Sequence, residues 1–332
     1  MRLGIGVSER RIGRQISASQ EVHRGRSSVV CVVEHDGYVG VGEVCPGLAE
    51  INGDPSLESV LAHAKSIGVR RIHDLIEHSP KDFRWADVRG LFGEQAQDRW
   101  VAALAESAIL DLTIQRAAAT WEEFFDSTPV ATGQITGSLI DGFDVHRHND
   151  AVTRVRLKCD ADTSVAALTE AATQVSVPLI IDANGVVLHE EQLDHIRRHG
   201  VMLEQAWHVG DWTTPAQLHA SGVVLSHDES IRSLRDVRAC VNYVAGGNIC
   251  LKPARLGGWA TTRDLARRAG EMGLTYYIGG FFESPLSRYR HAILASASGA
   301  GPSDVLVDES SPTLDMAMVA REALLSAVHF DF

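Results

Sequence analysis

Apolar and polar positions alternate near the start of the chain in a way that is typical of a β-hairpin. In the stretch SSVVCVVEHDGYVGVGE, the turn signal His35-Asp36-Gly37 separates two apolar runs. From about residue 55 to 125 the period becomes helical, and in QDRWVAALAESAILDLTIQRAA the small and apolar side chains recur at three- and four-residue steps. A sheet followed by helices predicts an α+β unit over residues 1–125.

After residue 128 the pattern changes to short apolar runs separated by helical segments. The expected strands are 130–136, 153–158, 178–184, 201–205, 223–228, 248–253, 275–280 and 304–308. Strand and helix alternate about every 24 residues, which indicates βαβ units with parallel strands. About eight such units in sequence favour a closed barrel, here expected over 126–309, with residues 310–332 returning to the first unit.

Composition narrows the function classes. The 332 residues carry 31 basic and 43 acidic side chains, a net charge of −12. A nucleic-acid or anionic-membrane partner is therefore not expected, because binding to either needs a basic surplus. Five scattered cysteines suggest reduced thiols, and the N-terminus lacks a secretory signal, so we expect a cytoplasmic protein.

A charged residue ends each of five successive predicted strands. Lys158, Asp182, Glu204, Asp228 and Lys252 follow one another at steps of 22 or 24 residues. The C-terminal ends of barrel strands form one ring, where active sites lie, so these side chains are expected to meet at one opening. Three converging carboxylates without Cys or His suit Mg²⁺, with Mn²⁺ as a substitute.

The two lysines would face each other across a bound carboxylate substrate. Removal of a proton next to a carboxylate creates an enediolate, which forms only where fixed cations lie close to the developing charge. Arg156 precedes Lys158 by two residues and should share its face of the strand. Its like charge would favour the neutral amine that a lysine base requires.

These motifs resemble the enolase superfamily, and within it the muconate lactonizing subgroup. Arg156-Leu157-Lys158 resembles the Lys-x-Lys motif of that subgroup, with arginine in place of the first lysine. Three segments resemble its metal-ligand motifs and one its second-lysine motif: Asp182-Ala183-Asn184, Glu204-Gln205, Asp228-Glu229-Ser230 and Leu251-Lys252-Pro253. The match is nearest to o-succinylbenzoate synthases and N-succinylamino acid racemases.

The resemblance implies a fold, a metal and residue roles. The expected fold is an α/β protein with a (β/α)7β-type TIM barrel and an α+β capping domain built mainly from the N-terminal part. Lys158 and Lys252 would be catalytic, and Asp182, Glu204 and Asp228 would hold Mg²⁺. Substrate contacts or supporting roles would fall to five further residues: Arg156, Asn184, Glu229, Arg255 and Glu283. A loop from about residue 13 to 26 would close over the substrate.

Several functions stay open at this point. The first is an o-succinylbenzoate synthase-like lyase that carries out a syn dehydration. The alternatives are a racemase or epimerase of N-acylated amino acids or dipeptides, a muconate-type cycloisomerase, and a barrel that binds without catalysis. Dipeptide epimerases usually carry Asp-x-Asp on the last strand, whereas Asp304 and Asp308 lie four apart here. The expected partner is a small carboxylate, and a homo-oligomer stays open.

Overall fold

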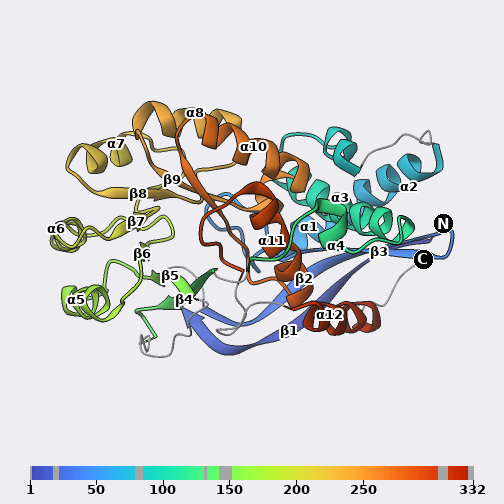
Figure 1. Cartoon of the computed structure of the whole chain (residues 1–332), viewed down its shortest axis with the longest axis horizontal. Helices are drawn as coiled ribbons and strands as arrows, with labels where there is room; N and C mark the ends of the chain where they lie inside the picture. Colours follow the sequence, from blue (N-terminus) through green and yellow to red (C-terminus); the bar gives the residue numbers. More distant parts are fainter. Residues whose placement is uncertain are drawn as a thin grey trace.

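The computed structural model describes residues 2–17, 22–78, 85–130, 133–141, 152–305 and 313–327. An antiparallel sheet with its helices lies beside a curled parallel sheet that is surrounded by helices (Figure 1). The first of these two units comes from the N-terminal part of the chain. This arrangement agrees with the expected fold class, an α/β barrel with an α+β cap.

Three antiparallel strands form the first sheet, in the order β1 (Arg2–Ser17), β2 (Val22–His35) and β3 (Tyr38–Val44). His35 pairs with Tyr38, which confirms the predicted hairpin. The expected loop over 13–26 is wrong for most of its length, because β1 continues to Ser17 and β2 begins at Val22. Ile16 pairs with His23 in antiparallel fashion, so the backbone is extended at the end of β1 and at the start of β2.

The first unit continues with helical segments, and the longest of them packs on this sheet. They are α1 (Leu57–His63), the π-helical turn η1 (Ala64–Gly68), α2 (Val69–His78), the 3₁₀ turn η2 (Trp85–Leu91), α3 (Ala96–Arg116) and α4 (Trp121–Phe125). Helix α3 packs directly on β3. A Cβ at Gly40 or Gly42 would lie 2.1 or 2.2 Å from the backbone oxygens of Ala108 and Leu104, so this close approach requires glycine.

Seven parallel strands of the described chain form the second sheet, in sequence order. They are β4 (Gly133–Ser138), β5 (Val152–Lys158), β6 (Leu179–Asp182), β7 (Met202–Glu204), β8 (Val224–His227), β9 (Asn248–Leu251) and β10 (Thr275–Ile278). Each overlaps a predicted strand. The helices between and after them are α5 (Val165–Gln174), α6 (Glu190–Arg198), α7 (Thr213–Ala220), α8 (Leu234–Tyr243), α9 (Pro253–Leu256), α10 (Trp259–Glu271) and α11 (Pro285–Ser298).

Residues 303–304 close the ring between the last and the first of these strands. The Asp304 N–H donates to the Ile278 carbonyl at 2.9 Å, and the Gln134 N–H donates to the Ser303 carbonyl at 2.8 Å. The sequence predicts an eighth strand over 304–308, and residues 306–308 of it lie outside the described chain. Residues 303–304 thus connect β10 to β4 and close the sheet into a barrel.

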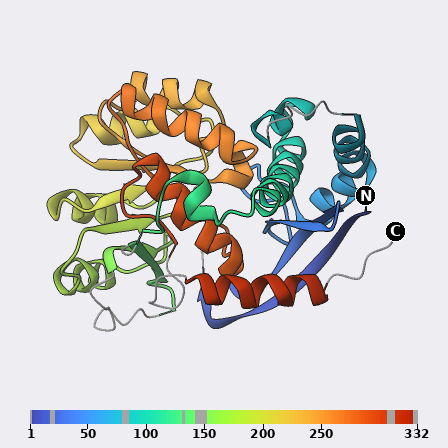
Figure 2. The same ribbon diagram turned by 45° about the vertical axis from the view of Figure 1, so that its right-hand side comes forward.

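Helix α12 (Leu314–Ala327) lies along β1 of the first unit (Figure 2). Arg321 forms an ion pair with Asp111 of α3 and donates to the Val39 carbonyl of β3. The last described helix therefore packs on the N-terminal unit. Among the described residues, no helix is both long enough and apolar enough to cross a membrane.

Candidate active site

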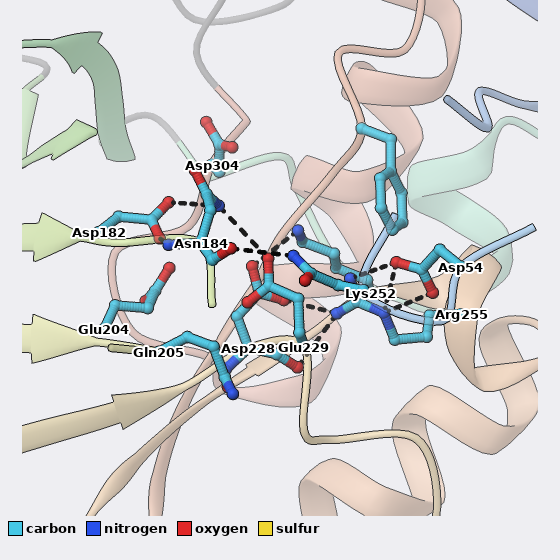
Figure 3. A network of polar contacts seen from close by, with 12 residues as sticks. Asp54, Asp182, Asn184, Glu204, Gln205, Asp228, Glu229, Lys252, Arg255 and Asp304 are labelled. Atoms are coloured by element: carbon cyan, nitrogen blue, oxygen red, sulfur yellow. Dashed lines mark hydrogen bonds and ion pairs between the residues drawn. The ribbon is translucent and has the colours of Figure 1, made fainter. Parts of the chain in front are cut away.

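Pairing between neighbouring strands brings the charged strand ends to one edge of the barrel. Lys158 of β5 pairs with Asp182 of β6, and Asp182 pairs with Glu204 of β7. Glu204 pairs with Ser226, so Asp228 stands two residues further along, just beyond β8. The side chains of Asp182, Glu204 and Asp228 are fully buried (Figure 3). Three carboxylates thus lie at the C-terminal ends of adjacent strands, as the spacing predicts.

Both oxygens of the Glu204 carboxylate accept hydrogen bonds. Oε1 accepts from Arg156 Nη1 at 3.0 Å, and Oε2 accepts from the hydroxyls of Tyr277 at 2.7 Å and Ser226 at 2.9 Å. Burial raises the pKa of Glu204, the charge of Asp182 raises it further, and Arg156 opposes both. Asp182 and Asp228 thus both disfavour the charged form of Glu204, as neighbouring like charges do.

Each lysine is paired with one of the acids. Lys158 Nζ donates to Asp182 Oδ2 at 3.1 Å and to Asn184 Oδ1 at 2.7 Å. Lys252 Nζ lies 2.7 Å from Asp228 Oδ2. Burial alone would raise the pKa of Asp228, but the charges of Lys252 and Arg255 outweigh it and hold the pKa well below its usual range.

The ring of Phe281, which follows β10, lies beside Lys252. Lys252 Nζ is 4.5 Å from the ring centroid, and the Arg255 guanidinium carbon is 5.2 Å from it. Burial would lower the pKa of Lys252, but Asp228 outweighs burial and raises it. The charged form of Lys252 is therefore favoured both by its carboxylate partner and by the aromatic face.

Arg156 lies inside the barrel and is nearly fully buried. Besides Glu204, it contacts Asp304 through Nη2 at 2.8 Å and the Tyr277 hydroxyl through Nη1 at 3.1 Å. Two carboxylates therefore balance its charge. The expected influence of this charge on Lys158 stays a prediction.

Arg255, in α9, links the barrel acids to the N-terminal unit. Its Nη1 donates to Asp228 Oδ1 at 2.6 Å, while its Nη2 lies 2.6 Å from Asp54 Oδ2. Asp54 also binds Arg232 at 3.0 Å, and these arginines outweigh burial and lower the pKa of Asp54. Sequence reasoning missed Asp54, since no motif or strand end marks it.

Of the remaining predicted site residues, Asn184 and Glu229 lie in the site and Glu283 lies beside it. Asn184 Nδ2 donates to Asp182 at 3.2 Å and to Glu229 Oε1 at 3.3 Å, which brings Asn184 and Glu229 into the site. Burial and the charge of Asp228 raise the pKa of Glu229 to about 7. Glu283 instead accepts the N–H of Phe281 at 2.8 Å, so it supports the turn after β10 and does not line the cavity.

A cavity of 110 Å³ opens between the two units at this edge. Both lysines line it, and Arg26 of β2 and Phe281 contribute to its wall. The Arg26 guanidinium donates to the carbonyls of Phe281 at 3.1 Å and Cys45 at 2.8 Å. A lining that combines charged groups with aromatic and small residues suits a carboxylate with an apolar body.

The chemistry of the acidic set fits a hard divalent cation. Three buried carboxylates supply oxygen ligands alone, the donor type that Mg²⁺ and Mn²⁺ bind. Their mutual repulsion, which adds to burial in raising the pKa of Glu204, is relieved by added positive charge. Within the described ranges no three acidic, histidine or cysteine side chains are already closed around a metal position, and protein cations pair with the acids instead.

Comparisons with known proteins place this chain in a family. Residues 141–322, more than half of the chain, match the family model described as Enolase C-terminal domain-like. Over 218 residues the chain is 28% identical to the o-succinylbenzoate synthase of Enterococcus faecalis, a match that covers 61% of this chain and 59% of that protein. The chain thus spans less than two thirds of that relative.

Solved structures agree on the fold. A probable mandelate racemase from Alicyclobacillus acidocaldarius superposes with a TM-score of 0.80 at 18% identity, covering 98% of this chain and 95% of that one. The L-Ala-D/L-Glu epimerase from Bacillus subtilis gives 0.77 at 18% identity, covering 93% and 89%. Such low identities establish only a common architecture. Together with the family match, they show that this chain belongs to the enolase superfamily.

Proposed function

We propose that the protein is a metal-dependent enzyme that removes the proton α to a substrate carboxylate, with a reaction like that of o-succinylbenzoate synthase. One observation carries the proposal: Lys158 and Lys252 come from strands separated by three others and line the same cavity, above buried carboxylates. In a barrel, strands so far apart lie on opposite sides, so a substrate between them meets an amine on each face.

The site residues have separate roles in the proposed reaction. Lys158 would take the α-proton and later return it to the departing hydroxyl, while Lys252 would stay protonated beside the developing enediolate. Asp182, Glu204 and Asp228 would hold Mg²⁺ or Mn²⁺, whose charge stabilises that anion when the ion is bound. Oε2 of Glu229 makes no hydrogen bond among the described residues and could accept one from a substrate hydroxyl.

The surroundings of Lys252 favour a lyase over a racemase. A racemase needs each lysine to act as a base in one direction, whereas the Phe281 ring, 4.5 Å from Lys252 Nζ, favours the charged amine of Lys252. A dipeptide epimerase is disfavoured by Asp304, whose carboxylate binds Arg156 at 2.8 Å and accepts the Thr136 hydroxyl at 3.2 Å. Asp308 lies outside the described residues.

Proton NMR in D₂O with Mg²⁺ tests the proposal. One sample contains the cyclohexadiene carboxylate precursor of o-succinylbenzoate, and parallel samples contain N-succinylamino acids. Dehydration of the first without α-proton exchange in the others supports the lyase. Exchange without dehydration assigns a racemase instead. Failure of both refutes these two reactions, and the same assay with muconate then separates a cycloisomerase from a barrel that only binds.

A further inference from the structure

Arg156 contacts three barrel strands and Asp304, which follows α11. Its Nη1 contacts Glu204 of β7 and Tyr277 of β10, and its Nη2 contacts Asp304 at 2.8 Å. Its Nε donates to the Thr136 hydroxyl of β4 at 3.3 Å. The guanidinium therefore has a fixed position, and its 3% exposed side chain is shielded from water.

Protein cations match the buried acids one by one. Lys158 pairs with Asp182 at 3.1 Å, and Lys252 pairs with Asp228 at 2.7 Å. Arg156 pairs with Glu204 at 3.0 Å and lies 3.9 Å from Asp182. A buried carboxylate without a nearby cation costs several kcal/mol, so these pairs decide whether the cluster can stay folded.

Arginine suits this position better than lysine. The planar guanidinium is always charged and has donors in a fixed fork, so it can bind Glu204 and Asp304 at once. A lysine ammonium in its place is a single point charge on a flexible stem. The replacement of the first lysine of the Lys-x-Lys motif therefore changes what the residue can hold together.

We infer that Arg156 is the resident counter-cation of Glu204: it positions this carboxylate and keeps the acidic cluster assembled before any divalent ion binds. The inference rests on the proposed function in one respect, the expected role of Glu204 as a metal ligand. Arg156 and a divalent ion then compete for the same carboxylate. Folding of the wild-type protein should therefore depend little on metal.

A double-mutant cycle in EDTA tests the pairing without metal. The proteins are the wild type, Arg156→Met, Glu204→Gln and the double variant, with Arg156→Lys as the charge-retaining control. Arg156→Met should lower the apparent Tm by roughly 5–15 °C, as expected for a broken buried ion pair. The double variant should regain about half of that loss, because Glu204 is no longer charged, and Arg156→Lys should lose less than Arg156→Met.

The inference is overturned if Arg156→Met unfolds within about 2 °C of the wild type, a difference smaller than such a loss allows. It is equally overturned if the double variant is no more stable than Arg156→Met, since side-chain packing alone would then explain the loss. Should Arg156→Met fail to fold, recovery of soluble protein in the double variant supports the pairing, and its absence contradicts it.

Addition of Mn²⁺ to the same proteins tests the competition. The Tm increase should be larger for Arg156→Met than for the wild type, because the ion replaces the missing charge and meets no fixed cation. An equal or smaller increase overturns the competition. If Mn²⁺ changes the Tm of none of the proteins, the metal dependence in the proposed function fails, while the cycle in EDTA still decides the role of Arg156.

Discussion

At the scale of single residues, the two lysines differ more in their partners than in their positions. Lys158 contacts one carboxylate and one amide oxygen, whereas Lys252 contacts a carboxylate and an aromatic face. The aromatic face next to Lys252 favours the charged form of that amine. We therefore assign the base to Lys158 in the proposed reaction.

Replacement of Lys158 by alanine should greatly slow the abstraction of the α-proton. We expect the rate of α-proton exchange or dehydration to fall by roughly 10²–10⁴-fold, the usual contribution of a positioned base. Proton NMR in D₂O gives this rate directly. Lys65→Ala, which removes an exposed lysine of η1, is the matched control and should react at the wild-type rate. A Lys158→Ala rate within tenfold of wild type would contradict the assignment.

At the scale of elements, the apolar runs and their charged ends could be predicted because both are local. The spacing of the charged residues along the sequence is enough to predict that the ends of β5 to β8 lie side by side, as their pairing shows. The partners of these residues could not be predicted in this way. Asp54, Tyr277 and Asp304 reach their charged partners through tertiary packing, and no motif in the sequence connects them to those partners.

The strand assignment failed where polar residues continue a strand. The resemblance implies a loop over 13–26, yet β1 extends to Ser17 and β2 begins at Val22, and pairing resumes at Ile16 after an irregularity that follows Arg11. A partner strand supplies backbone hydrogen bonds whatever the side chains are, so polarity alone does not reveal the extension.

The turn at residues 51–54 of the N-terminal unit is fixed to the barrel by charge. Asp54 binds both Arg255 and Arg232, and the Asn52 amide donates to the Asn184 carbonyl at 3.0 Å. The Arg255 side chain is 1% exposed and has two carboxylate partners, so loss of Asp54 leaves this buried charge with Asp228 alone. The turn should therefore be a rigid wall of the cavity.

Asp54→Asn should lower the free energy of unfolding by roughly 3–5 kcal/mol, as expected when one partner of a buried ion pair is removed. Asp264→Asn is the matched control, since Asp264 also binds two arginines but is 47% exposed. Its loss should cost less than about 1 kcal/mol. Urea denaturation measures both values. Equal losses of unfolding free energy in the two variants would show that burial does not strengthen the ion pairs of Asp54.

At the scale of the whole molecule, a buried acid connects the two units. Glu106 of α3 accepts the N–H of Ala260 at 3.0 Å and so caps the start of α10. A Cβ at Gly258 would lie 2.5 Å from Glu106 Oε2, so glycine is needed for this approach. Burial raises the pKa of Glu106 to about 8, although the hydrogen bonds from the helix oppose the shift.

This raised pKa links stability to pH. The unfolded chain releases the Glu106 proton above the ordinary glutamate pKa of 4.5, whereas the folded protein retains it up to about 8. The stabilising contribution is therefore complete below pH 4.5 and is lost as the pH rises through 8. Glu229, with a pKa of about 7, acts in the same direction, so Glu106 accounts for only part of the total.

Glu106→Gln should flatten this dependence, because glutamine keeps the shape of the carboxyl but has no proton to lose. Between about pH 6.5 and 8.5, the fall in unfolding free energy should be smaller in the variant than in the wild type by roughly 2 kcal/mol. Urea denaturation at several pH values gives the comparison. Glu123→Gln is the control, since Glu123 caps α4 at the surface, and it should follow the wild-type profile. Parallel profiles for Glu106→Gln and the wild type would mean that the buried carboxyl is already charged. In that case the contact between the units would rest on an ionised helix cap.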